Sequence, residues 1–219
     1  MAQRSPPLIV LMLVAALASV RPGAAHAANA SYDIDPVHTR VAFLISHAGF
    51  SRAIGTFSGS HGRLDFDPDD WTRAKLDVVV PIATLNLGDD KWREKILDAT
   101  FFNAGKFPEA HFVATKIEKT GDASAKITGD LTLHGVTRPV TLDATLNALR
   151  RHPLTLHKTA GFSATATLSR KDFGMDAWES VVADQVQLII EVEASRTHTD
   201  ASDTDKDHKD AEHADPQSH

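Results

Sequence analysis

The sequence predicts an all-β fold, an eight-stranded antiparallel barrel with one short helix inserted. Apolar and polar residues alternate with a period of two through most of the chain, which is typical of strands that bury one face. Eight or nine such runs recur at regular spacing between turn residues, and a helical period occurs in one short stretch. A sandwich of two sheets fits the same pattern. Closure into a barrel is favoured, because it removes exposed strand edges and lets about eight strands enclose one small ligand.

The expected strands can be followed in order along the chain. In the run at 38–47, Val41, Phe43 and Ile45 share one face. Glycines in the run at 55–66 predict a bend or bulge where a curved sheet turns a corner. Near the middle of the chain, two strands are expected to meet through a turn at 135–139. The predicted strands lie at residues 32–34, 38–47, 55–66, 76–82, 110–119, 125–133, 140–149, 161–169 and 185–194.

One short helix is expected at 91–98. Trp92 and Ile96 stand at helical spacing there, behind acidic residues that favour the start of a helix. Asp89, Asp90 and Glu94 could also be interpreted as paired carboxylates for acid and base chemistry. Capping and the helix dipole explain them without catalysis.

Both ends of the chain differ from the predicted barrel. Residues 1–27 contain Arg4, an apolar run and the sequence Ala25-His26-Ala27, the layout of a cleaved secretory signal peptide; cleavage after Ala30 fits equally well. The apolar run is shorter than the ~20 residues of a membrane-spanning helix, so no stable membrane anchor is expected. Residues 196–219 have no aliphatic residue larger than alanine and no aromatic residue, and are expected to be disordered. The barrel domain is therefore predicted at 28–195.

Composition excludes several classes of protein. The chain has no cysteine, so disulfides, thiol nucleophiles and thiolate metal ligands are absent. Its formal net charge of −6 argues against a nucleic-acid partner, because such proteins need a clustered basic face. Histidine and aspartate residues in the tail could chelate metal ions weakly, at a spacing that matches no defined site.

Catalytic signatures are absent from the sequence. It contains no GxSxG, HExxH or P-loop motif, so we expect no catalytic residues, no structural metal and no cofactor. Arg170, Lys171 and Asp172 precede Phe173-Gly174, where a turn held by a buried arginine is an economical interpretation.

Aromatic and aliphatic residues instead mark the candidate site. They could simply fill a core. In a barrel, however, the inward faces surround a space, and an apolar lining without convergent catalytic groups fits a lipid-like guest. The strand at 38–47 also places His47 on the side of its apolar residues, as a polar contact near one end. The candidate ligand-binding residues are Phe43, Ile45, His47, Phe57, Phe101, Phe102, Phe112, Leu131, Leu133, Phe162 and Trp178.

Several stretches resemble the YceI-like family of exported, lipocalin-like barrels. The resemblance covers residues 32 to about 194, and implies a periplasmic barrel that holds a polyisoprenoid or other long-chain amphiphile, without enzymatic activity. One departure is the sequence from Trp92 to Leu97, which lacks the histidine that the family usually shows before its double phenylalanine. The matching stretches are YDIDPVHTRVAFLISH, GTFSGSHGRLDFDP, FFNAGKFPEAHF, GDLTLHGVTRPV, SRKDFGM and VADQVQLIIEVEA.

Three hypotheses follow, in decreasing order of support. The first is a periplasmic carrier for an isoprenoid or similar amphiphile. The second is a metal-binding periplasmic protein that uses the His/Asp-rich tail. The third is an enzyme that acts on a barrel-bound lipid. The sequence leaves a homodimer open.

Overall fold

The computed structural model describes residues 29–197, which form ten strands and one α-helix, α1 (Asp90–Leu97). Three short 3-10 helices occur as well, at Trp71–Arg73, Ile82–Thr84 and Lys171–Phe173. The strands are β1 (Ala30–Ile34), β2 (Arg40–His47), β3 (Ser51–Phe57), β4 (His61–Phe66), β5 (Lys75–Pro81), β6 (Glu109–Lys119), β7 (Ser124–Leu133), β8 (Val136–Arg151), β9 (Lys158–Ser169) and β10 (Val182–Arg196).

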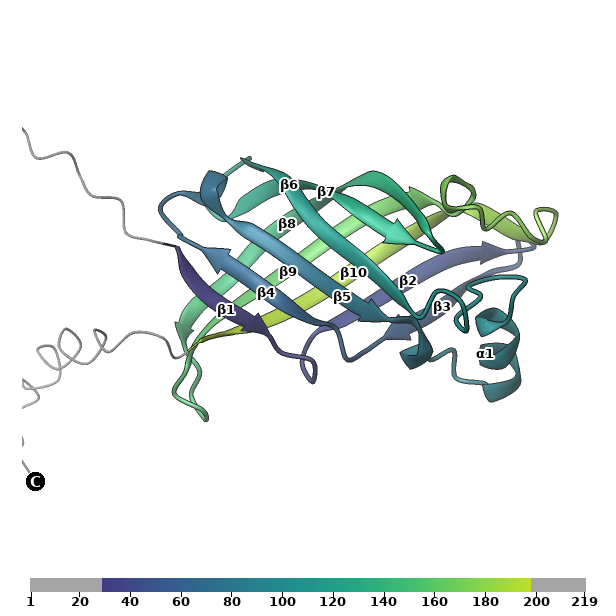
Figure 1. Cartoon of the computed structure of the whole chain (residues 1–219), viewed down its shortest axis with the longest axis horizontal. Helices are drawn as coiled ribbons and strands as arrows, with labels where there is room; N and C mark the ends of the chain where they lie inside the picture. Colours follow the sequence, from purple (N-terminus) through teal and green to yellow (C-terminus); the bar gives the residue numbers. More distant parts are fainter. Residues whose placement is uncertain (1–28, 198–219) are drawn as a thin grey trace, which may run out of the picture.

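The strands form a closed antiparallel barrel, as the sequence predicts (Figure 1). Eight of them follow one another in the order β1-β4-β5-β6-β7-β8-β9-β10, and pairing of β1 with β10 closes the ring. The β2–β3 hairpin pairs with the same edge of β10 as β1 does, at β10 residues that precede those paired with β1. That long strand pairs with β1 at residues 194–196 and with β2 at residues 182–191. The hairpin therefore extends one wall of the barrel past the closed ring.

The run at 55–66 is broken into two strands at the expected bend. Residues 58–60 separate β3 from β4, and Gly59 has a φ of +70°. At Gly62 φ is +148°, and a Cβ built there would lie 2.0 Å from the Asp77 carbonyl oxygen. Glycine therefore allows β4 to pack closely against the backbone of β5.

The turn between β7 and β8 is shorter than the predicted loop at 135–139. It consists of His134 and Gly135, whose φ values are +52° and +76°. Two residues with positive φ form the tight turn that matches the twist of paired strands. As a result β8 begins at Val136, and Pro139 pairs with Asp130 inside the sheet.

The helix forms where the sequence predicts it. The Asp89 side chain accepts a hydrogen bond from the Trp92 amide at 2.7 Å, which caps the first turn. Arg93 fastens the helix to the segment after β5, because its Nε donates to the Leu85 carbonyl at 2.8 Å and its Nη2 donates to the Ala83 carbonyl at 2.7 Å. The helix thus lies beside one end of the barrel (Figure 1).

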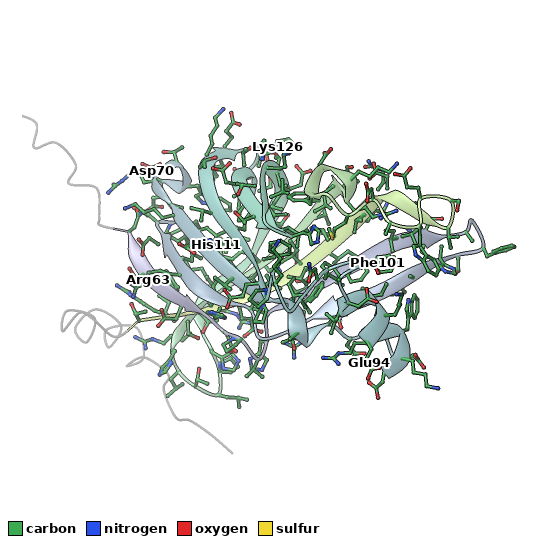
Figure 2. All side chains as sticks on the ribbon, turned by 45° about the vertical axis from the view of Figure 1, so that its right-hand side comes forward. Arg63, Asp70, Glu94, Phe101, His111 and Lys126 are labelled. Carbon is green, nitrogen blue, oxygen red and sulfur yellow. The ribbon has the colours of Figure 1, made fainter. Side chains whose placement is uncertain are left out.

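Packed rings close the opposite part of the barrel. Trp71 is buried, and its Nε1 donates to the Pro68 carbonyl at 3.0 Å. The ring of Phe66 meets Trp71 edge to face at 5.2 Å between centroids and meets Phe162 at 5.5 Å. These residues belong to a second hydrophobic cluster that also contains Tyr32 and Ile117. Charged side chains such as Arg63, Asp70 and Lys126 lie around the outside (Figure 2).

The described part of the chain ends just after the last strand. Arg196 still pairs with Tyr32, and the Thr197 amide donates to the Ser31 carbonyl at 2.9 Å. The predicted signal peptide and the rest of the predicted tail lie outside the described residues. Within residues 29–197, no helix combines the length and the apolar character of a membrane span.

Candidate functional site

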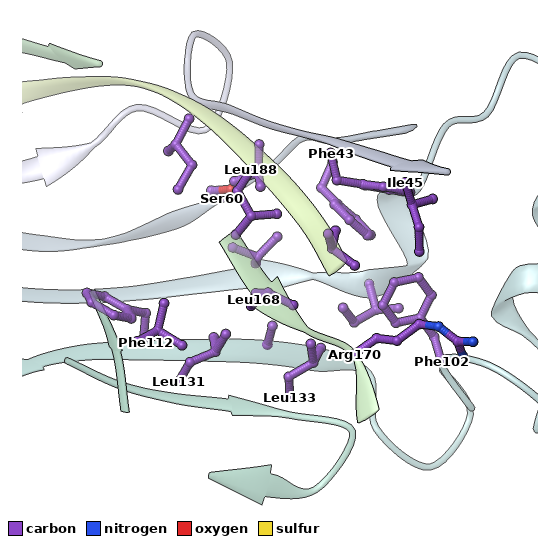
Figure 3. Close-up of a pocket in the computed structure, with 18 of the residues that line it drawn as sticks. Phe43, Ile45, Ser60, Phe102, Phe112, Leu131, Leu133, Leu168, Arg170 and Leu188 are labelled. Atoms are coloured by element: carbon purple, nitrogen blue, oxygen red, sulfur yellow. The ribbon is translucent and has the colours of Figure 1, made fainter. Parts of the chain in front are cut away.

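An apolar cavity of about 400 Å³ lies inside the barrel (Figure 3). Alternation along each strand forms it, because every second side chain faces inward. On β2 these side chains include Val41, Phe43 and Ile45, and on β7 they include Leu131 and Leu133. The volume is within the range of about 300–1,000 Å³ that is typical of sites for small ligands.

All eleven candidate residues from the sequence line this one cavity. Phe43 and Phe57 are buried and their rings lie 5.8 Å apart, while Phe102 meets Phe57 edge to face at 5.7 Å. The remaining candidates are Ile45, His47, Phe101, Phe112, Leu131, Leu133, Phe162 and Trp178. Their position in the lining is a structural finding, and their contact with a guest is part of the proposal below.

Aliphatic residues of β10 are the main part of the lining that sequence reasoning missed. Val186, Leu188, Ile190 and Val192 all face the cavity. Their spacing of two within a predicted strand is the signal that could have identified them. The candidate residues are mostly aromatic, so this aliphatic wall is missing from them.

The end of the cavity near α1 carries aromatic and polar side chains together. The His47 and Trp92 rings lie 6.4 Å apart at an edge-to-face angle, and Phe101 lies 6.2 Å from Trp178. Lys95 also lines this region and pairs with Asp98, with 2.7 Å between Nζ and Oδ2. That pairing lowers the pKa of the Asp98 carboxyl, through the hydrogen bond from Lys95.

Arg170 holds the loop that borders this end, as the sequence interpretation expected. Its guanidinium is buried and donates to three backbone carbonyls: from Nε to Ala183 at 2.9 Å, from Nη2 to Val182 at 2.9 Å, and from Nη1 to Met175. Within residues 29–197 no carboxylate lies within ion-pair distance of it. The carbonyl oxygens therefore compensate the burial of this charge.

Two buried hydroxyl groups, of Thr39 and Ser60, also line the cavity. The Thr39 hydroxyl donates to the Glu193 carbonyl at 3.3 Å. The Ser60 hydroxyl is buried and has no hydrogen-bond partner within the described chain. Among residues 29–197, neither hydroxyl has a histidine or a carboxylate partner that would make it a nucleophile.

A separate group of titratable residues lies at the turn between β1 and β2. The Asp35 carboxylate accepts from the Val37 amide at 2.7 Å and lies 2.7 Å from His38 Nδ1. Partial burial opposes ionisation of Asp35, but the hydrogen bonds from His38 and from the backbone lower its pKa overall. The hydrogen bond to Asp35 and its charge raise the pKa of His38. With Glu193 these residues could offer three metal ligands whose atoms lie within 4.8 Å of one another; none of the three lines the cavity.

His111 and His134 lie outside the cavity lining. His111 pairs with Asp77 on the neighbouring strand at 2.7 Å, and the His134 ring packs on Phe107 with 4.8 Å between centroids. His47 is the one described histidine that lines the cavity. His47, His111 and His134 therefore do not meet at one site.

Comparison with known proteins agrees with this architecture. The model of the YceI-like domain matches residues 32–194. A UPF0312 protein of Pseudomonas savastanoi is 39% identical over 168 residues, covering 77% of this chain and 86% of that protein. A UPF0312 protein of Photorhabdus laumondii is 34% identical over 187 residues, covering 85% of this chain and 96% of that protein.

Solved structures show the same barrel. The YceI protein of Campylobacter jejuni is 30% identical, with a TM-score of 0.62 over 68% of this chain and 87% of that one. BcnA of Burkholderia cenocepacia aligns with a TM-score of 0.64 at 23% identity, over 71% and 95% of the two chains. A polyisoprenoid-binding domain of Saccharophagus degradans aligns with a TM-score of 0.57 at 12% identity, over 77% and 99%. From its matched residues and its barrel, the chain belongs to the YceI-like domain family.

Proposed function

We propose that this protein is a carrier that holds a polyisoprenoid or a similar long amphiphile inside its barrel. One observation carries the proposal: an apolar cavity of about 400 Å³ lies within the closed sheet, lined by residues from all ten strands. Phe162 lies at the boundary of the cavity, and the rings of Phe66 and Trp71 packed behind it fill the barrel beyond. A guest with an extended apolar chain fits such a space, and binding needs no covalent bond or metal.

The energetics support binding of a long chain. Burying about 500 Å² of hydrocarbon at ~25 cal/mol per Å² contributes about 12 kcal/mol. Association and ordering cost about 4 to 15 kcal/mol; at the lower end of this range about 8 kcal/mol remains, which corresponds to a Kd of about 1 µM. A shorter guest would bury less area and bind more weakly.

The comparisons support the class of guest. A barrel of the same fold in Saccharophagus degradans is described as a polyisoprenoid-binding domain. At 12% identity that likeness concerns the fold, so the guest of the present chain is inferred from its own cavity. The apolar lining favours a prenyl or acyl chain, and the sparse polar groups near His47 and Lys95 favour a small head group.

The place of action is part of the proposal. The predicted signal peptide at 1–27 supports export to the periplasm, where a carrier could keep an apolar molecule out of water. Fractionation of cells that make the full chain tests this. Recovery in the periplasmic fraction, with a mass that begins after Ala27 or Ala30, is the expected result, and retention of the full-length chain in the cytoplasm would contradict it.

Uptake of a labelled prenyl alcohol tests the function directly. Guest-free protein, prepared by unfolding, extraction and refolding, should bind the label in a stoichiometric and saturable way. An unlabelled chain of equal length should compete, and a short polar alcohol should not. Failure of refolded, monodisperse protein to bind any prenyl or acyl chain would refute the proposal.

The tail hypothesis of metal binding remains a separate prediction. The histidine and aspartate residues of the predicted tail lie outside the described residues. Truncation after Ser195 separates the two activities: metal binding should be lost and guest binding kept if the tail is a metal-binding accessory. Metal binding that persists after truncation would indicate a metal site in the barrel instead.

A further inference from the structure

Large aromatic side chains are exposed around the α1 end of the cavity. Phe50, at the tip of the β2–β3 hairpin, is 93% exposed, Trp178 is 57% exposed and Trp92 on α1 is 38% exposed. We refer to these three residues as the mouth rim. An aromatic side chain in water contributes nothing to the core, and exposed apolar groups that gather at one place are typical of an interaction surface.

Contacts between the segments place the mouth rim around the cavity. The Ala48 amide in the hairpin turn donates to the Val181 carbonyl at 2.6 Å, which joins the hairpin tip to the loop that carries Trp178. Trp92 contacts His47 at the end of β2. Both Trp92 and Trp178 also line the cavity, whereas Phe50 does not. In Figure 1 the hairpin tip and α1 lie at the same end of the barrel.

The backbone conformation at this end indicates that the exposed Trp178 side chain has a role other than stabilising the fold. Trp178 has a φ of +58° and Ala48 has a φ of +50°, a left-handed conformation that disfavours residues with a side chain. Two hydrogen bonds hold Trp178, since its carbonyl accepts from the Val181 and Val182 amides at 2.9 and 2.8 Å. The fold thus fixes a bulky ring in an unfavourable conformation and leaves it largely in water.

The exposed charges of this end are close to balance, with a small acidic excess. The segments at 47–53, 88–108 and 170–182 carry seven acidic residues and six basic residues besides Arg170, whose guanidinium is buried. Asp184, which accepts from the Lys171 amide at 3.1 Å, adds one more carboxylate. A face without a basic excess has no electrostatic attraction to an anionic bilayer. The basic residues are Arg52, Lys91, Arg93, Lys95, Lys106 and Lys171, and the acidic ones in the segments are Asp89, Asp90, Glu94, Asp98, Asp172, Asp176 and Glu179.

We propose that the mouth rim docks on a zwitterionic lipid bilayer, so that the guest passes between membrane and cavity without crossing water. This inference rests on the proposed carrier function. Indole rings have one apolar and one polar part and favour the membrane–water interface, where Phe50 would insert its ring. A long apolar guest dissolves in the same bilayer, so a mouth that contacts lipid meets its cargo directly. Because the face has no basic excess, it favours a zwitterionic over an anionic surface.

Vesicles of phosphatidylcholine test the docking surface. The informative variant is Phe50→Ser, because Phe50 is highly exposed and does not line the cavity. The matched control is Leu154→Ser, which removes an 87% exposed side chain from the turn between β8 and β9, at the other end of the barrel (Figure 1). Sedimentation measures partition, and brominated phosphatidylcholine should quench the fluorescence of the two rim tryptophans in the bound state.

The expected result separates docking from guest binding. Phe50→Ser should lower the partition coefficient about tenfold and slow guest uptake from vesicles, while Leu154→Ser leaves both unchanged. Guest affinity measured in solution should be the same in all three proteins. Phe50→Trp should bind vesicles at least as tightly as the wild type.

Other outcomes overturn the inference in distinguishable ways. Guest binding in solution without wild-type binding to vesicles refutes docking and leaves the carrier function intact. Vesicle binding that Phe50→Ser and Leu154→Ser reduce equally refutes the assignment to the mouth rim. A wild-type dimer that Phe50→Ser converts to a monomer, without vesicle binding, assigns the surface to a second copy of the chain. Vesicle binding without guest uptake from any source refutes the carrier function instead.

Discussion

Filling the cavity should abolish guest binding and stabilise the protein. Ala164 on β9 pairs with Ala144 on β8 and with Ile190 on β10, and all three line the cavity. Two adjacent alanines leave room on this wall, so Ala164→Phe should place its ring in the space that the guest would occupy. The variant therefore exchanges empty volume for side-chain contacts.

The magnitude follows from the cavity. Empty apolar volume costs about 24 cal/mol per Å³, so a ring that fills about 100 Å³ should stabilise the guest-free protein by about 2 kcal/mol. For a domain of this length the melting temperature should rise by about 6 °C. About a quarter of the 400 Å³ cavity would be lost, and binding of a long prenyl chain should weaken at least tenfold.

Two assays on one preparation test this prediction. Thermal melting of the guest-free protein measures the stabilisation, and titration with a labelled prenyl alcohol measures the affinity. The control is Thr165→Phe, which adds the same ring one residue along β9, at an exposed position. If Ala164→Phe bound the guest as tightly as the wild type, the assignment of the cavity as the binding site would be wrong.

Three further predictions concern stability. Arg170→Met should destabilise the fold by about 3 kcal/mol in urea unfolding, because buried carbonyl oxygens lose their donor, and Arg170→Lys should restore less than half. The raised pKa of His38 means that its interaction with Asp35 stabilises the fold below the unfolded-state pKa of about 6.5 and is lost as pH rises through the folded-state value. His38→Asn should therefore remove part of the decline in unfolding free energy between pH 6 and pH 8, and an unchanged pH profile would contradict this. Gly62→Ala should lower the melting temperature markedly, because its Cβ would meet the Asp77 carbonyl oxygen; a neutral effect would refute the close packing of β4 on β5.

The barrel could be predicted because its strands bury one face. A period of two predicts which side chains of a strand share a face. Phe43, Ile45 and Leu131, selected as inward-facing on this basis, all line the cavity. The helix start was predictable because Asp89 is a cap of the kind that helices favour. Local chemistry therefore determined most of the candidate site.

Features that depend on pairing could not be predicted from local patterns. The run at 55–66 splits because β4 must reach β1 and β5 while β3 pairs with β2, which depends on strand order. The loop expected at 135–139 shortens to two residues, because Val136 to Pro139 find partners on β7. The exposure of Phe50 could not be predicted either, because its position at a hairpin tip depends on the register of β2 with β3.

Native mass spectrometry of the protein, isolated under mild conditions from the cells that make it, tests the central claim most directly. The proposed function predicts a discrete mass adduct, which organic extraction should release as a molecule with a prenyl or acyl chain. Ala164→Phe, prepared in the same way, should lack the adduct. A clean apo mass for the wild type, together with a failure of refolded protein to take up any such chain, would contradict the account and return the aromatic residues to the role of ordinary core.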